Sequence, residues 1–210
     1  MHNPQNTQYT GKPLEEASRV MIMVHGRGAT AGSILSLAPY FAVNDMAFVA
    51  PQATGNTWYP YSFLAPIQEN EPGLSSGLAV IDQWVTQLVE KGFVSGQIYL
   101  LGFSQGACLA LEYAARHPRT FGRIFGLSGG LIGPPGTPRN YTGGFGGTPV
   151  FLGCSDTDAH IPKERVLETA EVFGQMGATV TTRLYPNAPH TILEDEITFI
   201  KDGLQQQTQP

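Results

Sequence analysis

Three segments of this 210-residue sequence match the pattern G-x-S-x-G, which is typical of a nucleophilic serine on a sharp turn between a strand and a helix. The central serines are Ser75, Ser104 and Ser128. Because the chain contains 25 glycines, the pattern also arises by chance. The flanking sequence must therefore identify the serine that is placed for chemistry.

Only Ser104 lies between a predicted strand and a predicted helix. The apolar run I-Y-L-L-G-F precedes it, and the helical pattern A-C-L-A-L-E-Y-A-A-R, ended by Pro118, follows it. Ser75 follows E-P-G without a strand and is expected to cap the next helix. Ser128 follows an apolar run, but the G-G-L-I-G-P-P after it does not continue as a helix. Ser104 is therefore the predicted nucleophile.

A serine hydroxyl is a weak nucleophile that needs a base to remove its proton and a carboxylate to orient the base. On a fold with such a serine turn, the acid and then the histidine follow the serine along the chain. His117 ends the predicted helix after Ser104, and His160 lies only two residues from a candidate acid. His190 follows the apolar run 179–185 and precedes a helix, at the sheet edge where sites gather. His190 is the predicted base.

Two aspartates, Asp156 and Asp158, are candidates for the acid. Both follow the apolar run 149–153. Either one would also serve as an ordinary turn or capping residue ahead of Pro162. Their positions relative to the end of the strand do not separate them, so both remain open at this point.

The segment H-G-R-G at residues 25–28 follows the first strong apolar run. A glycine-rich turn there can present a backbone N–H beside that of Gln105, the residue after the predicted nucleophile. Two such donors form an oxyanion hole, which binds the negative oxygen of a tetrahedral intermediate. The sequence therefore predicts acyl-transfer chemistry.

The elements that must position these residues follow an alternating order. Short apolar runs separated by helical patterns are typical of a single α/β domain with a mostly parallel sheet and helices on both faces. We expect this domain over residues 17–204, preceded by an N-terminal segment at 1–16 and followed by a disordered tail at 205–210. The predicted strands are 19–24, 46–50, 97–103, 122–127, 149–153 and 179–185, and the predicted helices are 77–90, 108–115, 163–176 and 192–204.

Composition narrows the classes of partner. The net charge is −5 and the charges are scattered, which disfavours a nucleic-acid-binding surface. The two cysteines, Cys108 and Cys154, are interpreted as buried thiols, with no disulfide framework or metal site. No secretory signal and no apolar run of about 18 residues is visible. We therefore expect a cytoplasmic protein without a membrane span.

With H-G-R-G, G-F-S-Q-G, D-A-H-I-P and P-H-T in this order, the chain resembles the phospholipase/carboxylesterase family of α/β hydrolases over residues 17–204. The resemblance implies a Ser-Asp-His hydrolase of esters or thioesters without a large lid or a cofactor. It also implies that the N–H groups of Arg27 and Gln105 form the oxyanion hole.

The resemblance favours Asp158 as the acid, because the family acid typically stands four residues before a proline, here Pro162. Ala159 occupies a position where the family often has proline. A second family feature, a glycine three residues before the acid, would instead select Asp156, which follows Gly153. Asp156 therefore stays as the alternative acid.

We predict a serine carboxylesterase that acts on small or medium-chain esters through an acyl-enzyme. A thioesterase, lysophospholipase or acyltransferase would use the same residues, and a non-catalytic binding module would use the same fold. A dienelactone-hydrolase-like role is disfavoured, because that group has cysteine where this chain has Ser104. A small-molecule ester is the expected partner, and a homodimer is open.

Substrate-binding residues are expected in the loop 52–74, which is rich in aromatic side chains. The Arg27 side chain is a candidate for favouring an acidic group on the substrate. The alternative for the aromatic residues is that they simply pack the loop onto the domain. The predicted pocket residues are Trp58, Tyr59, Tyr61 and Phe63.

Overall fold

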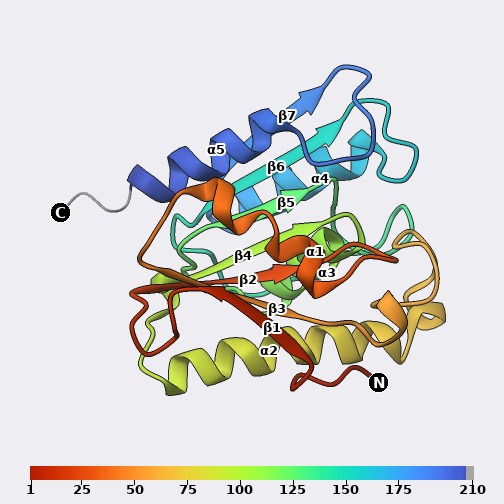
Figure 1. Ribbon diagram of the computed structural model, residues 1–210. Helices are drawn as coiled ribbons and strands as arrows, with labels where there is room; N and C mark the ends of the chain where they lie inside the picture. Colours follow the sequence, from red (N-terminus) through yellow and green to blue (C-terminus); the bar gives the residue numbers. More distant parts are fainter. Residues whose placement is uncertain (207–210) are drawn as a thin grey trace.

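The computed structural model describes residues 1–206, in which the predicted apolar runs form a twisted central sheet with helices on both faces (Figure 1). The strand order is β1-β3-β2-β4-β5-β6-β7, and all neighbours are parallel except β1 and β3. The predicted α/β class with a mostly parallel sheet is confirmed. The strands are β1 Thr7–Gly11, β2 Arg19–Val24, β3 Met46–Pro51, β4 Ile98–Phe103, β5 Ile124–Leu127, β6 Pro149–Ser155 and β7 Thr179–Tyr185.

Strand β1 lies within the N-terminal segment 1–16, for which the sequence predicts no strand. It pairs antiparallel with β3 at one edge of the sheet, and four of its five residues are exposed. Besides this backbone pairing, Thr7 and Tyr9 contact the Trp84 side chain. An exposed edge strand carries almost no apolar pattern, because few of its side chains are buried. This is why the first 16 residues gave no strand signal.

The helices form a layer on each side of the sheet. Helices α2, α3 and α4 pack on one face, and α1 and α5 pack on the other (Figure 1). Within residues 1–206, no helix is both long and apolar enough to cross a membrane. The α-helices are α1 Ala31–Leu35, α2 Gly73–Glu90, α3 Gln105–Arg116, α4 Lys163–Gln175 and α5 Glu194–Gln205, and the short 3-10 helices are Ala38–Phe41, Thr54–Asn56, Ile67–Asn70 and Ser95–Gln97.

Two predicted helix ends need correction. Helix α2 begins at Gly73, so Ser75 lies inside its first turn and does not cap it. The Glu71 carboxylate instead accepts hydrogen bonds from the Ser75 amide at 2.9 Å and from its hydroxyl at 2.7 Å. At the other end of the described residues, Gln205 still belongs to α5, and Gln206 is the C-cap residue of this helix. The rest of the predicted disordered tail, 207–210, lies outside the described residues.

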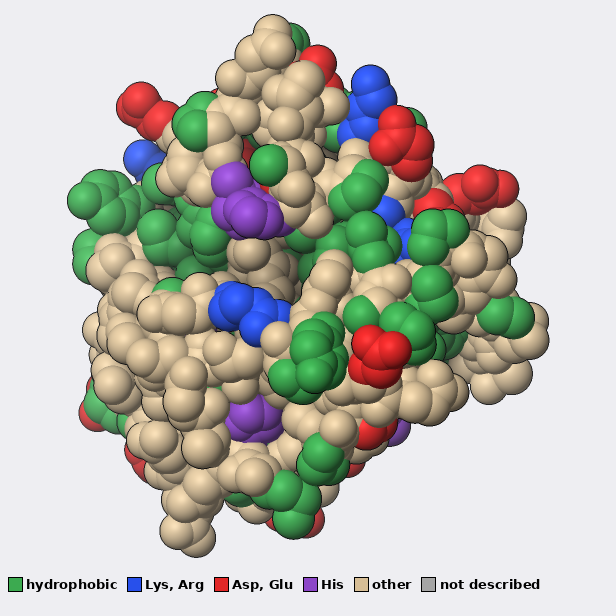
Figure 2. Space-filling view, turned by 90° about the vertical axis from the view of Figure 1, so that its right-hand side faces the viewer, with side chains coloured by type: hydrophobic (Ala, Val, Ile, Leu, Met, Phe, Trp, Pro, Cys, Tyr) green, Lys and Arg blue, Asp and Glu red, His purple; other side chains and the backbone are tan. Residues whose placement is uncertain are grey.

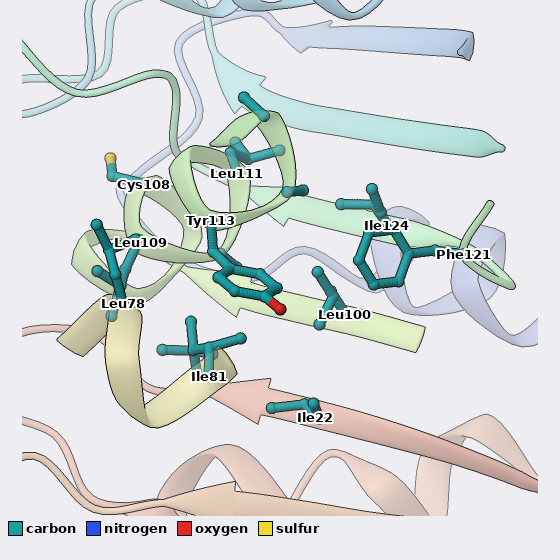
Figure 3. Close-up of a cluster of buried hydrophobic side chains, with 14 of the residues drawn as sticks. Ile22, Leu78, Ile81, Leu100, Cys108, Leu109, Leu111, Tyr113, Phe121 and Ile124 are labelled. Atoms are coloured by element: carbon teal, nitrogen blue, oxygen red, sulfur yellow. The ribbon is translucent and has the colours of Figure 1, made fainter. Parts of the chain in front are cut away.

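Both faces of the central strands are covered, which explains their continuous apolar runs. In β2, Val20, Ile22 and Val24 face the α2–α3 side, whereas Met21 and Met23 face the α1–α5 side. Figure 3 shows the first of these clusters, where side chains from α2 and α3 meet those of β2, β4 and β5. The labelled members include Ile22, Leu78, Ile81, Leu100, Leu109 and Tyr113.

Two glycines allow α3 to start directly against the sheet. A methyl group added at Gly102 would lie 2.6 Å from the Ala107 Cα, and one added at Gly106 would lie 2.5 Å from the His25 carbonyl oxygen. Both distances are far below an ordinary contact between heavy atoms, and backbone atoms cannot swing aside. The turn between β4 and α3 therefore requires glycine on either side of the serine.

We expect Gly106→Ala to lower the free energy of unfolding by about 1–3 kcal/mol, as at other overpacked core positions. The matched control is Gly174→Ala in α4, where an added methyl group meets nothing within 4 Å. That change should stabilise the protein by about 0.5–1 kcal/mol, because alanine is the better helix former. Urea unfolding of both variants measures the difference. A Gly106→Ala protein as stable as the wild type would contradict the packing argument.

Candidate active site

Ser104 occupies the turn between the end of β4 and the start of α3. Its backbone has φ 54° and ψ −121°, an unfavourable conformation for a residue with a side chain, with a typical cost of about 1–3 kcal/mol. The Ser104 amide donates to the Leu127 carbonyl oxygen at 2.9 Å, which anchors the turn to β5. The turn places the hydroxyl at the carboxyl edge of the sheet. By contrast, Ser128 is buried and no helix starts directly after it.

The structure brings Ser104, His190 and Asp158 together, although they come from three separate loops. Ser104 Oγ lies 2.9 Å from His190 Nε2, and His190 Nδ1 lies 2.6 Å from Asp158 Oδ2. An ionised carboxylate only accepts hydrogen bonds, so Nδ1 carries the proton and Nε2 is free to accept from the hydroxyl. This arrangement can transfer the serine proton to the imidazole.

The Asp158 side chain has no exposed surface, yet it is held in the ionised form. Burial alone would raise its pKa. Hydrogen bonds from His190 and from the backbone amides of His160 at 2.8 Å and Ile161 at 3.0 Å outweigh that effect. The pKa of Asp158 therefore lies below its usual value of 3.8. The Cys154 thiol adds a weak contact, with Sγ 3.8 Å from Asp158 Oδ2.

Asp156, the alternative acid, makes a different contact. Its Oδ1 accepts from the Asn187 amide at 2.8 Å, and its own amide donates to the Tyr185 carbonyl oxygen at 3.1 Å. Asn187 has φ 52°, a left-handed turn conformation that asparagine tolerates. Asp156 therefore holds the backbone of the loop that carries His190, whereas Asp158 contacts the His190 ring.

The His190 ring is supported by two neighbouring rings. The Phe103 ring centroid lies 5.1 Å from it, and the His160 ring meets it edge-on at 4.9 Å. The hydrogen bond to Ser104 Oγ comes from the His190 ring, whereas the His160 ring packs against that of His190. These ring contacts restrict the imidazole to the orientation that the hydrogen bonds require.

The H-G-R-G turn packs beside the serine turn. A methyl group added at Gly26 would lie 3.4 Å from the Ser104 Cβ. Within the turn, the Gly28 amide donates to the Asn56 carbonyl oxygen at 2.7 Å and the Ala29 amide donates to Gly26 at 3.2 Å. Gln105 is the first residue of α3, where an amide has no acceptor inside the helix. Arg27 and Gln105, which lie in these two turns, both line the cavity beside Ser104.

Three buried side chains, whose structural role the sequence does not indicate, fix these two turns. Trp58 Nε1 donates to the His25 carbonyl oxygen at 2.9 Å, and the Trp58 amide donates to Gln105 Oε1 at 2.9 Å. His25 Nε2 accepts from the Ala53 amide at 3.1 Å, and burial lowers the pKa of His25, which favours the neutral ring. The motif H-G-R-G pointed to this turn, but nothing in the sequence linked His25 to Trp58.

A cavity of about 410 Å³ opens above Ser104. Figure 2 looks onto this carboxyl edge of the sheet and shows a hollow with histidine and basic side chains around it. Of the predicted pocket residues, Tyr59, Tyr61 and Phe63 line the cavity. Trp58 does not: it is fully buried, and its indole is used to hold the His25 turn. Among residues 1–206, no group of three or more His, Cys, Asp or Glu side chains is placed to hold a metal ion.

Glu196, at the start of α5, is a second buried carboxylate close to the site. Its Oε2 accepts from the Leu193 amide at 2.8 Å, which closes the loop that follows His190. The carboxylate packs so closely on β6 that a methyl group at Gly153 would overlap it. Burial raises the pKa of Glu196 to about 7, and a single amide donor does not offset this effect.

We expect Glu196→Gln to flatten the pH dependence of stability between about pH 4.5 and pH 7. In that window the folded wild type keeps the Glu196 proton and the unfolded chain loses it, so wild-type stability falls as pH rises. Glutamine still accepts from Leu193 and does not titrate, so the variant should gain up to about 3 kcal/mol relative to wild type above pH 7.

Urea unfolding at several pH values measures this gain. Glu194→Gln, which changes an exposed carboxylate in the same turn, is the control and should leave the profile close to wild type. Parallel pH profiles for wild type and Glu196→Gln would rule out the buried carboxyl as the cause.

Comparisons with known proteins agree with this architecture. The family model described as Phospholipase/Carboxylesterase matches residues 6–208. Acyl-protein thioesterase 1 of Saccharomyces cerevisiae is 30% identical over 220 residues, which cover 91% of this chain and 95% of that protein. A probable carboxylesterase of Arabidopsis thaliana, described as SOBER1-like, is 24% identical over 157 residues and covers 73% of this chain and 60% of its own length.

A solved structure gives the same assignment. The phospholipase/carboxylesterase from Dyadobacter fermentans is 44% identical, covers 96% of both chains and superimposes with a TM-score of 0.93. The resemblance noted from four short motifs is thus confirmed over nearly the whole chain. This protein belongs to the phospholipase/carboxylesterase family of α/β hydrolases and is a serine hydrolase of that family.

Proposed function

We propose that the protein is a carboxylesterase that hydrolyses small or medium-chain carboxylic esters through an acyl-enzyme formed on Ser104. One observation carries this proposal, namely the unbroken hydrogen-bonded chain from Ser104 through His190 to Asp158 at the floor of an open cavity. Such a chain activates a hydroxyl for attack on a carbonyl carbon. The family of the chain supports the same chemistry.

In the first step, Ser104 Oγ attacks the ester carbonyl carbon while His190 Nε2 takes the hydroxyl proton. The carbonyl oxygen becomes negative in the tetrahedral intermediate and accepts hydrogen bonds from the Arg27 and Gln105 amides. His190 then gives its proton to the alcohol oxygen, the C–O bond breaks and the alcohol leaves. The product of this step is an ester between Ser104 and the acyl group.

In the second step, a water molecule takes the place of the alcohol. His190 Nε2 removes a proton from the water, whose oxygen attacks the acyl carbon, and the same two amides receive the negative oxygen. His190 returns the proton to Ser104 Oγ as the acid is released. Asp158 stays ionised throughout, because its lowered pKa lies far below neutral pH, and it stabilises the imidazolium form of His190.

The size of the cavity supports a small or medium-chain substrate. Its volume of about 410 Å³ lies toward the lower end of the range for small-molecule sites. Tyr59, Phe63 and Ile161 provide apolar surface for an acyl or alkyl chain. The small-molecule ester expected as partner fits this space.

A thioesterase is the second candidate, because a relative that is 30% identical is named acyl-protein thioesterase 1. The same three residues would attack a thioester, so the substrate alone separates the two activities. Comparing kcat/KM for an oxygen ester and a thioester with the same acyl chain distinguishes them. Transfer of the acyl group to an added alcohol instead of water would indicate an acyltransferase.

We expect Ser104→Ala to lower kcat for p-nitrophenyl butyrate by about 10⁶-fold, as in other enzymes that lose the triad serine. It should also abolish covalent labelling by a fluorophosphonate probe. Ser75→Ala, in a second G-x-S-x-G segment, is the matched control and should keep both properties. Labelling of Ser75 or Ser128, found by peptide mass spectrometry, would contradict the assignment, and the absence of both labelling and turnover in the wild type would favour a binding module.

We expect Asp158→Asn to lower kcat by about 10⁴-fold, because an amide side chain would stabilise the wrong tautomer of His190. Asp156→Asn should cost much less, since Asp156 contacts only the backbone of the His190 loop. Steady-state kinetics of the two variants, with circular dichroism to verify folding, decides between them. Small and equal losses in both variants would exclude Asp158 as the catalytic acid.

A further inference from the structure

We propose that the preferred substrate carries a carboxylate in addition to the ester that is hydrolysed, and that Arg27 is the side chain that selects it. This inference rests on the proposed function, because it concerns the substrate class of the same cavity. It adds a charged recognition group to a site otherwise described by its apolar walls.

The residues that line the cavity carry positive charge and no negative charge. Arg27 lines it with a permanently charged guanidinium, and among the described residues around the cavity there is no aspartate or glutamate. Asp158, the acid that is hydrogen-bonded to His190, has a side chain without exposed surface. It contacts Nδ1 of the His190 ring, the nitrogen that does not face Ser104. An anionic group in this cavity therefore meets positive charge and no opposing carboxylate.

The Arg27 guanidinium is held in place by neutral groups. Nη1 donates to the Pro60 carbonyl oxygen at 2.7 Å, and Nη2 donates to the Tyr61 carbonyl oxygen. Within residues 1–206, no carboxylate forms an ion pair with Arg27. A guanidinium has five N–H donors, so these two contacts leave donors free and the full positive charge unpaired. Fixing a cation in advance lowers the entropic cost of binding an anion.

Arg27 is also close to the reaction. Its neighbour Gly26 packs on the Ser104 Cβ, and the proposed oxyanion hole uses the Arg27 amide. Arg27 thereby links the serine turn to the aromatic loop through Pro60 and Tyr61. A carboxylate bound by Arg27 would therefore share the cavity with the ester carbonyl that Ser104 is proposed to attack.

His160 provides a second polar contact from another loop. Its amide is fixed by Asp158 Oδ1 at 2.8 Å, and its ring packs edge-on against His190. An imidazole ring has an N–H group to donate, so His160 can form a hydrogen bond with an anion. Phe63 and Ile161 line the same cavity and suit a short alkyl chain between the ester and the carboxylate.

The test compares substrates that differ only in charge. On the acyl side, the p-nitrophenyl monoester of adipic acid is compared with the p-nitrophenyl ester of its monoamide. On the alcohol side, 3-butyryloxypropanoate is compared with 3-butyryloxypropanamide. Each kcat/KM is corrected for uncatalysed hydrolysis and measured for the wild type, Arg27→Met and Arg27→Lys.

We expect the wild type to prefer the carboxylate by about fivefold or more in one of the two pairs, as for a single partly solvated ion pair. That pair identifies the side of the ester that carries the charge. In Arg27→Met, the ratio of kcat/KM for the carboxylate substrate to that for the amide should fall toward one. In Arg27→Lys, this ratio should be largely kept. Raising the ionic strength to 1 M should reduce the preference of the wild type for the carboxylate substrate, because salt screens the charges. This measurement does not depend on whether a variant folds.

Failure of this inference and failure of the proposed function would give different results. Turnover of the neutral substrates with no charge preference in either pair, or a preference that Arg27→Met and added salt leave unchanged, would overturn this inference alone. No turnover of any of the four substrates would overturn the proposed function and this inference with it.

Discussion

The unfavourable backbone conformation of Ser104 is the constraint on which the rest of the site depends. The two elements that flank this residue, β4 and α3, are both buried, and their packing holds the turn in this conformation. Gly102 and Gly106 let α3 approach β2 and β4, where a methyl group would collide with backbone atoms. The packing of the core thus stabilises a conformation that local energetics disfavours. The same packing gives the Gln105 amide its direction.

Buried polar groups also fix the second turn beside the cavity, the H-G-R-G turn at residues 25–28. His25, Trp58 and Gln105 satisfy one another and the adjoining backbone, so the two turns beside the cavity are tied together by buried hydrogen bonds. A buried polar network in which the members have partners is rigid, because breaking any bond leaves a desolvated group unpaired. Preorganised amides need no rearrangement when charge develops on a substrate oxygen. This is a physical reason for burying a histidine and a glutamine next to the site.

Two buried carboxyl groups show how nearby hydrogen-bond donors decide whether a buried carboxyl group is ionised. Asp158 receives hydrogen bonds from one imidazole and two amides, and its pKa is lowered despite burial. Glu196 receives one amide hydrogen bond, and its pKa is raised to about 7. Burial penalises both anions, and the number of donors decides the outcome. Arg27, which has no ion-pair partner among residues 1–206, lines the cavity together with His190, whereas the ionised Asp158 carboxylate is buried against the His190 ring.

The sequence by itself determined the fold class, the family and most of the elements, because apolar periodicity reports burial and the motifs are contiguous. It also singled out Ser104 and His190, since the required neighbours of each lie within a few residues along the chain. The family resemblance favoured Asp158 over Asp156, but residue spacing left both open. Only the tertiary structure shows Asp158 at the His190 ring and Asp156 at the loop backbone, an arrangement that depends on how the ends of β6 and β7 align. Only the tertiary structure revealed the edge strand β1. It also showed that Trp58, predicted to line the pocket, instead donates a hydrogen bond to the His25 carbonyl oxygen. Those features rest on contacts between distant segments, which residue types and spacing do not encode.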